Sequence, residues 1–336
     1  MSETGPGYLA LYRSGELERR VKALEARLEE CDICPRECRT RRLEGNTGAC
    51  NSGALPIVSS FCAHHGEEPA LSGSRGSGTI FFGNCNMRCV YCQNFQISQD
   101  PVNQRQYEVT TRVLAERMLY LQDELKCHNI NLVTPSHFVP QIARAVFEAV
   151  PRGLRLPLVY NTSSYDSLRT LKQLDGIIDI YLADLRYASN EAGRRYSGVP
   201  DYTEISRAGI KEMYRQVGDL LVDEEGVAIK GLMVRHLILP NGIAGSEESL
   251  RWLAREVSPR VAVSIMSQYY PAHLAYKYRE LYRKILPAEY DEVARLAEEL
   301  GMENGWLQEM ESAGHYRPDF AADEPFAKKE EGESGR

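Results

Sequence analysis

The hydrophobic positions of the chain recur with two periods, one helical and one typical of strands. Leu17, Val21, Leu24 and Leu28 are three or four residues apart, which predicts a helix over 14–30. Further along the chain, short runs rich in β-branched and aromatic residues alternate with segments of helical period. This alternation predicts an α/β fold built around a parallel sheet.

Six strand-and-helix units are expected in this part of the chain. The predicted strands are residues 79–82, 131–134, 156–160, 177–182, 229–239 and 261–266, and the predicted helices are residues 110–125, 140–150, 168–174, 205–217, 247–256 and 290–300. Six such units favour a partial (β/α)6 barrel of the TIM type. A doubly wound open sheet would give the same pattern.

Two stretches of the chain lack both periods. Residues 31–77 are rich in Gly, Arg and Cys, and we expect an irregular segment organised by metal. Residues 323–336 are charged and contain Gly, Ser and Pro, which is typical of a disordered tail. The expected organisation is an N-terminal helix with a cysteine-rich extension (1–78), the barrel (79–287), and a C-terminal helix with its tail (288–336).

Composition narrows the class of protein. The chain has 336 residues, 43% of them hydrophobic and 26% charged, as in ordinary globular proteins. A net charge of −7 argues against nucleic acid as a partner, and no apolar run approaches the roughly 20 residues that cross a bilayer. Residues 1–7 lack the apolar core of a signal peptide, so a cytoplasmic location is expected. Nine cysteines are then unusual, because clustered cytosolic thiols usually bind metal or do redox chemistry.

Three of these cysteines, Cys85, Cys89 and Cys92, directly follow the first predicted strand. Active sites of parallel α/β folds are built at this end of the strands. The spacing lets three thiolates converge on one [4Fe–4S] cluster, which normally takes four, so that one iron stays open for a ligand such as the methionine end of S-adenosylmethionine (SAM). The alternatives are a zinc site, for which no adjacent Cys or His supplies the fourth ligand, and an accidental grouping of cysteines.

The segment Cys85-Asn-Met-Arg-Cys89-Val-Tyr91-Cys92 resembles the signature of the radical SAM superfamily. The resemblance implies a partial (β/α)6 barrel over about 79–270, with the cluster held by the three cysteines and the aromatic Tyr91 close to the adenine of SAM. It also implies a reaction in which the cluster gives an electron to SAM, and the resulting 5′-deoxyadenosyl radical takes a hydrogen atom from the substrate.

Within that superfamily the chain looks most like relatives of the pyruvate formate-lyase activating enzyme. The similar segments are residues 85–94, 133–138, 159–163, 181–186, 234–240 and 266–271. Two places depart from the activase pattern: Thr134-Pro-Ser-His137 stands where activases have Gly-Gly-Glu, and Asp184-Leu-Arg186 stands for Asp-x-Lys. These departures concern the substrate more than the cofactor.

The activase resemblance implies a substrate and a partner. The hydrogen donor would be a backbone glycine of a glycyl-radical enzyme, and a flavodoxin- or ferredoxin-type protein would supply the electron. Two alternatives stay open. One is radical modification of another protein, an RNA or a metabolite, and the other is a zinc-dependent interaction module without catalysis.

Polar side chains mark the ends of the apolar strands, which independently favours a polar site there. With Tyr91, the residues expected to bind the cofactor are Thr134, Asn161, Asp184, Arg235 and Gln268. Asp184 is expected to hold SAM, because it lies in the matched segment. Each residue also has a structural interpretation, as a loop former, a cap or an ion-pair partner. Arg235 and His236 alternate along one strand, so one of the two is expected to face the site.

A second group of cysteines precedes the barrel. Cys31, Cys34, Cys38 and Cys50 could supply four thiolates to zinc or to a closed iron–sulfur cluster. Such a site would be structural or would transfer electrons. The alternative is a loop of reduced thiols without metal.

Overall fold

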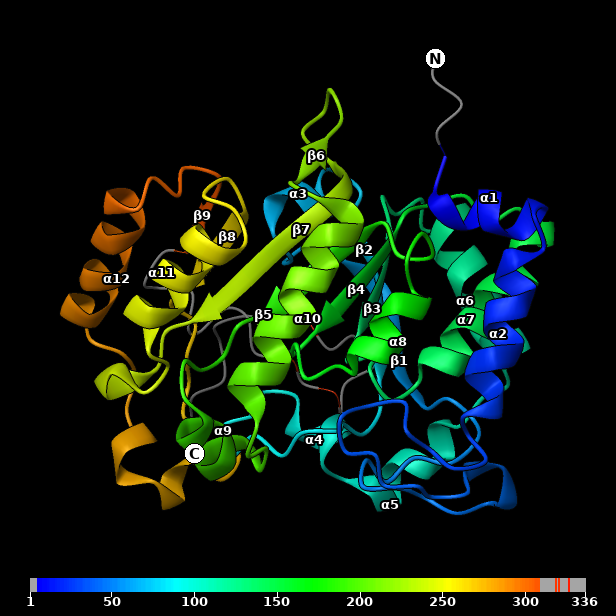
Figure 1. Ribbon diagram of the computed structural model, residues 1–336, viewed down its shortest axis with the longest axis horizontal. Coiled ribbons are helices and arrows are strands. Elements are labelled where there is room, and N and C mark those ends of the chain that lie inside the picture. Colours follow the sequence, from blue (N-terminus) through cyan, green and yellow to red (C-terminus); the bar gives the residue numbers. More distant parts are fainter. Residues whose placement is uncertain (1–4, 309–317, 319, 321–325, 327–336) are drawn as a thin grey trace, which may run out of the picture.

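A computed structural model describes residues 5–308 together with Pro318, Phe320 and Phe326 (Figure 1). Within these residues the chain forms a nine-stranded sheet in the order β1-β2-β3-β4-β5-β7-β8-β9, with β6 paired to β7. The strands are β1 (Val58–His64), β2 (Ser77–Phe82), β3 (Ile130–Val133), β4 (Leu158–Thr162), β5 (Ile180–Asp184), β6 (Leu221–Val222), β7 (Ala228–Leu237), β8 (Ala262–Met266) and β9 (Gly305–Leu307).

The sheet is mixed but mostly parallel. All pairs from β2 to β9 along the main path are parallel, whereas β1 is antiparallel to β2 and β6 is antiparallel to β7. The strands follow one another across the sheet in chain order, with no reversal. A doubly wound sheet requires such a reversal, so that alternative does not describe this chain. The six predicted strands are confirmed as β2, β3, β4, β5, β7 and β8.

The longer helices follow the strands much as the helical periods predict. The helices are α1 (Gly7–Arg13), α2 (Glu16–Ala26), α3 (Pro69–Ser72), α4 (Phe95–Ser98), α5 (Pro101–Gln104), α6 (Thr111–Asp123), α7 (Val139–Ala149), α8 (Leu168–Gln173), α9 (Asn190–Ser197), α10 (Tyr202–Val217), α11 (Ser246–Glu256) and α12 (Pro287–Glu299). The start of α6 has a clear cause, since the hydroxyl oxygen of Thr110 accepts a hydrogen bond from the Val113 amide and satisfies one free N–H of the first turn.

The two faces of the sheet are covered differently. Buried side chains from α2, α6, α7 and α10 join one large apolar cluster with residues of the sheet. Alternate positions of the strands, among them Ile180, Met233 and Ala262, belong to a second and smaller cluster, where they pack with Ala70 and Leu71 of the short helix α3. Because side chains alternate along a strand, the positions that follow these on the same face are the polar residues at the strand ends.

Two predictions about the flanking segments are corrected or extended by the structure. The expectation of an irregular segment over 31–77 is wrong for β1, whose residues Val58–His64 pair with β2. This strand is mostly half-buried and its sequence Val-Ser-Ser-Phe-Cys-Ala-His does not alternate cleanly, so it gave no period-2 signal. Strand β9 likewise extends the sheet from the segment after α12.

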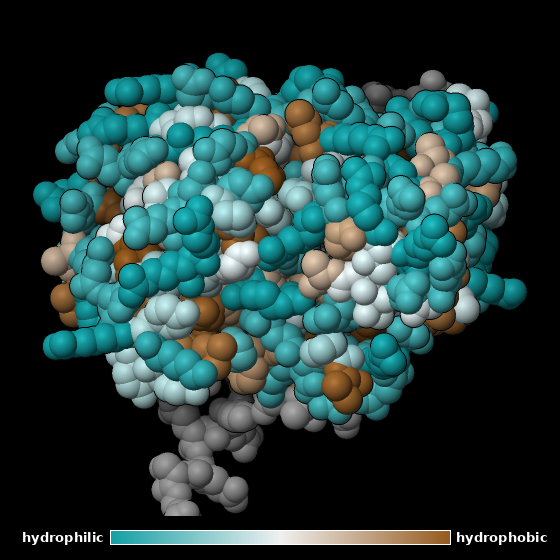
Figure 2. Space-filling model, turned by 60° about the horizontal axis from the view of Figure 1, so that its bottom comes forward, coloured by the Kyte–Doolittle hydropathy of each residue, from teal (hydrophilic) through white to brown (hydrophobic). Residues whose placement is uncertain are grey.

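The predicted tail, residues 323–336, lies outside the described residues except for Phe326. The ring of Phe326 packs against Phe81, with ring centroids 5.5 Å apart, and against His64, with centroids 4.0 Å apart. No helix among the described residues is long and apolar enough to cross a membrane. The face shown in Figure 2 is largely hydrophilic, with apolar residues in small separate groups.

Candidate metal and cofactor site

The three-cysteine loop leaves the end of β2 through a tightly packed turn. A Cβ on Gly83 would collide with the side chain of Ile57 and come within 2.7 Å of the Gln104 side-chain oxygen, so glycine is required there. Asn84 adopts a left-handed conformation (φ 63°). From the segment between β3 and α7, His137 Nε2 donates a 3.0 Å hydrogen bond to the carbonyl oxygen of Gly83. These contacts fix the direction in which the cysteines leave the sheet.

The three thiols have hydrogen-bonding neighbours, and positive charges also act on two of them, Arg88 on Cys85 and Arg186 on Cys92. The Cys85 sulfur accepts a hydrogen bond from the Met87 amide at 3.3 Å, and the Cys89 sulfur accepts one from the Ser197 hydroxyl at 3.0 Å. Burial raises the pKa of Cys85 to about 12, and burial followed by the neighbouring Cys89 also raises the pKa of Cys92. Thiols in such surroundings stay protonated until a metal lowers their pKa.

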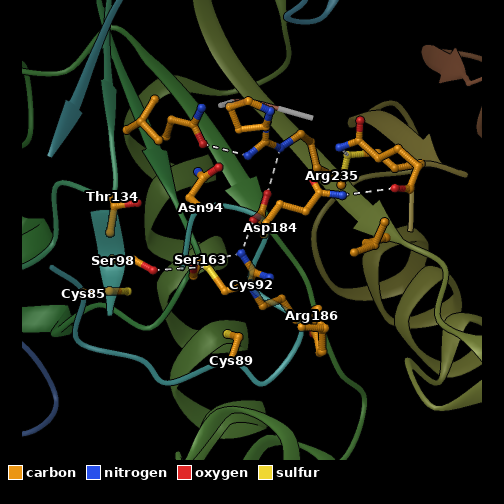
Figure 3. A pocket seen from close by; sticks show the side chains of 18 of the residues that line it. Cys85, Cys89, Cys92, Asn94, Ser98, Thr134, Ser163, Asp184, Arg186 and Arg235 are labelled. Atoms are coloured by element: carbon orange, nitrogen blue, oxygen red, sulfur yellow. Dashed lines mark hydrogen bonds and ion pairs between the residues drawn. The ribbon is translucent and has the colours of Figure 1, made fainter. Parts of the chain in front are cut away.

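All nine residues predicted for the cluster and SAM line one cavity of about 200 Å³. The residues are Cys85, Cys89, Cys92, Tyr91, Thr134, Asn161, Asp184, Arg235 and Gln268. Figure 3 shows the three cysteines in its lower half, with Asp184 and Arg235 above them. Residues from the cysteine loop and from the C-terminal parts of five strands therefore meet at one end of the sheet, as expected for parallel strands.

The charged part of the site is a hydrogen-bonded network around Asp184. One carboxylate oxygen of Asp184 accepts from Arg235 Nε at 2.8 Å, and the other accepts from Arg186 Nη2 at 2.7 Å. Arg235 Nη2 also donates to the side-chain oxygen of Asn161 at 2.7 Å. Burial by itself would lower the pKa of Arg235, but the nearby carboxylates, Asp184 foremost, raise it above its ordinary value. The guanidinium therefore stays charged inside the protein.

The remaining predicted residues line the cavity in different ways. Tyr91 is buried, and its hydroxyl lies 2.6 Å from that of Tyr187. Thr134 has a left-handed backbone (φ 61°), which is uncommon for a β-branched residue and places it at the turn where β3 ends. The side-chain oxygen of Gln268 accepts a hydrogen bond from Gln308 at 3.2 Å.

As predicted, only one of the neighbouring residues Arg235 and His236 faces the site. Arg235 lines the cavity, whereas His236 is fully buried and lies outside the cavity lining. His236 Nδ1 donates to the carbonyl oxygen of Leu185 at 2.8 Å, and its Nε2 accepts from the Ser246 hydroxyl at 2.8 Å. Both ring nitrogens are satisfied, so His236 is a structural residue in this fold.

Sequence reasoning missed several polar residues of the cavity, among them Arg186, Ser163 and Glu67. Arg186 and Ser163 were visible in the segments similar to activases, and the Arg186 side chain donates to the Ser163 hydroxyl oxygen at 3.1 Å. Glu67 precedes Pro69 in a stretch with no motif and no period, so no sequence signal pointed to it. Its presence in the lining depends entirely on how β1 joins the sheet.

The structure also gathers the four N-terminal cysteines. Cys31, Cys34 and Cys50 are buried, and Cys38 is half-buried. Burial raises the pKa of Cys34 to about 12, and the charges of Cys50, Cys31 and Cys38 add to this effect. A Cβ on Gly48 would lie 2.7 Å from the Cys38 sulfur, so a glycine makes room for that thiol. Four thiols from one irregular segment thus lie within electrostatic range of one another.

Neither cysteine group is closed around a single ion. Over the part of the chain that the structure describes, no three or more His, Cys, Asp and Glu side chains are arranged to hold one metal ion. Four ligands of one zinc ion must crowd around it at about 2.3 Å each. Three thiols in the lining of one cavity match the donor set of a cluster with one open iron better than that of a zinc ion, which takes four ligands.

Comparisons with known proteins find a similar protein, but its function is not characterised. No protein-family model matches the chain. The chain is 27% identical over 291 residues to the uncharacterised protein MJ0674 of Methanocaldococcus jannaschii, and the match covers 85% of this chain and 80% of that protein.

Proposed function

We propose that this protein is a radical SAM enzyme. The observation that carries the proposal is the meeting of Cys85, Cys89 and Cys92 with the polar strand ends in one cavity. The cysteine spacing alone resembles the superfamily signature, and the cavity adds the polar groups that a zwitterionic nucleoside such as SAM requires.

The chemistry of the donors fits the proposed cofactors. Three cysteines face the cavity, and no fourth cysteine is among the described residues that line it. Three thiolates leave one position of a [4Fe–4S] cluster open. A cluster held there by Cys85, Cys89 and Cys92 would supply the electron for reductive cleavage of SAM.

The residues of this chain bind and orient SAM in the proposal. Arg186 and Arg235 carry the positive charge of the site and are aligned by Asp184 between them. Arg186 replaces the lysine of the activase pattern and offers a planar, permanently charged group for a carboxylate. Tyr91, held by Tyr187, gives the adenine an apolar wall.

We also propose that the parallel strands form a partial (β/α)6 barrel. The argument is the sequential order β2-β3-β4-β5-β7-β8, in which each new strand is added on the same side of the last. Right-handed crossovers then place all connecting helices on one face and leave the other face for the interior of the barrel.

The test is anaerobic reconstitution with iron and sulfide, followed by reduction, addition of SAM and measurement of 5′-deoxyadenosine. We expect product from the wild type and none from Cys85→Ala, Cys89→Ala or Cys92→Ala. Cys127→Ala is the matched control, because Cys127 is buried outside the cavity lining and should leave the yield unchanged. A colourless zinc protein without SAM turnover would overturn the proposal in favour of a non-catalytic module.

The narrower activase hypothesis has its own test. The reconstituted protein should place a glycyl radical, detected by electron paramagnetic resonance, on a glycyl-radical enzyme of the same organism. 5′-Deoxyadenosine without a glycyl radical would leave a radical SAM enzyme with another protein, an RNA or a metabolite as substrate.

A further inference from the structure

An acidic residue enters the cavity on a segment that begins at the N-terminal end of the parallel strands, opposite the cysteine loop. Strand β1 is antiparallel to β2, and His64 at its end pairs with Ser77 at the start of β2. The segment after β1 therefore begins where the parallel strands start, whereas the cysteine loop lies where they end. Glu67 of this segment nevertheless lines the cavity together with Asp184 and Arg235.

The short helix α3 anchors this segment against the sheet. Leu71 of α3 is fully buried in the apolar cluster on the cavity face, and its carbonyl oxygen accepts a 2.9 Å hydrogen bond from the Asn129 side chain. The carbonyl oxygen of Glu68 accepts from the Leu71 and Ser72 amides at 2.8 and 3.0 Å. The backbone next to Glu67 is therefore fixed by packing and by hydrogen bonds.

Glu67 forms an ion pair with the one nitrogen of the Arg235 guanidinium that contacts neither Asp184 nor Asn161. Arg235 Nε and Nη2 donate to Asp184 and Asn161, and Nη1 lies 3.5 Å from Glu67 Oε2. The Arg235 and Glu67 side chains are 16% and 9% exposed, so water screens this ion pair little. A planar guanidinium that is held at three edges keeps one orientation.

We propose that Glu67 is a positioning residue for the SAM site: it fixes the Arg235 guanidinium, which in turn holds Asp184 and Asn161 in their binding positions. This inference rests on the proposed function. It adds a residue from outside the segments similar to activases, contributed by the loop between β1 and α3 rather than by the parallel strands.

The charge of Arg235 acts on Glu67 and also on its neighbour Glu68. Burial raises the pKa of both Glu67 and Glu68, whereas the charge of Arg235 lowers it. Two adjacent buried carboxylates repel one another, so protonation of one relieves the repulsion. Glu67 makes the contact with Arg235, and Glu68 lies outside the lining of the cavity.

The first experiment compares Glu67→Gln with the wild type in the reconstituted full-length protein. We expect the Kd and KM for SAM to rise about tenfold while kcat changes less than about threefold, because the interaction lost orients bound SAM. Glu212→Gln is the matched control, since it removes a buried carboxylate that pairs with Arg215 outside the lining of the cavity, and it should stay within about twofold of the wild type.

A double-mutant cycle separates positioning from general destabilisation. If Glu67 acts through Arg235, adding Glu67→Gln to Arg235→Lys should weaken SAM binding no further. If Glu67→Gln does not fold, Glu67→Asp replaces it in the same cycle, because it keeps the charge and shortens the side chain. Wild-type SAM affinity in the variant, or additive losses in the cycle, would overturn the inference alone. A wild-type protein with a loaded cluster that does not bind SAM would instead overturn the proposed function.

Discussion

Asp184 and Arg235 occupy directly paired positions on β5 and β7, and their side chains form a 2.8 Å ion pair at the cavity. Residues at paired positions of parallel strands point to the same face, so the register of these two strands creates the contact. The carboxylate and the guanidinium are 11% and 16% exposed. The pair is therefore shielded from water, and each partner depends on the other to remain buried.

Asp184→Asn should weaken both the fold and SAM binding. The amide keeps the shape but leaves two guanidinium groups without their shared negative partner. We expect the free energy of unfolding to fall by about 3 kcal/mol, as for other broken buried pairs, and SAM affinity to fall at least about tenfold. Urea unfolding and equilibrium dialysis measure the two effects. Glu247→Gln removes an exposed i,i+4 pair with Arg251 and should change stability by less than about 0.5 kcal/mol; equal losses in the two variants would contradict this prediction.

Gly83→Ala should destabilise the turn that carries the cysteine loop. The added methyl group would overlap the Ile57 side chain and crowd Gln104, at a cost of about 1–3 kcal/mol. Gly53→Ala is the control, because a Cβ there meets nothing within 4 Å, and it should be neutral or slightly stabilising. Thermal unfolding of both variants checks the prediction. A Gly83→Ala protein with wild-type stability would show that the turn relaxes freely.

Stability should fall between neutral and mildly acidic pH, partly because of His236. Burial lowers the pKa of His236 from 6.5 to about 4, so the folded state keeps the ring neutral. Between these two values the unfolded state binds a proton that the folded state does not, and stability therefore decreases as pH falls through this window. In urea titrations at several pH values, the free energy of unfolding of His236→Gln should fall less steeply between pH 6.5 and 4 than that of the wild type. The difference in slope should correspond to close to one proton. An unchanged slope would show that His236 is protonated in the folded protein.

The N-terminal cysteines should bind metal independently of the cavity. After reconstitution, Cys34→Ser is expected to lose one zinc ion or one cluster relative to the wild type, as measured by elemental analysis. The absorbance of the cluster at Cys85, Cys89 and Cys92 should remain. Cys62→Ser provides the control, because Cys62 lies in β1 outside both groups. Identical metal content in wild type and Cys34→Ser would indicate reduced thiols without metal.

The sequence by itself determined the local elements and the set of candidate ligands. Six strands and their helices follow from periodic burial, which depends on neighbours along the chain. The prediction that polar residues at Thr134, Asn161, Asp184 and Gln268 lie together follows from one further rule, that parallel strands end at the same edge. The spacing of the cysteines identified the loop that faces them.

Tertiary structure alone decided which distant segments complete the cavity. Strand β1 has a half-buried sequence without alternation, and its antiparallel pairing depends on the edge of β2 rather than on its own residues. Because of that pairing, Glu67 contacts Arg235, from which it is 168 residues away in the sequence. Likewise, alternation along the strand predicted that one of Arg235 and His236 faces the site. The register of β7 against its neighbours determines that this residue is Arg235. Such contacts arise from long-range packing, which leaves no period or spacing in the chain for sequence analysis to detect.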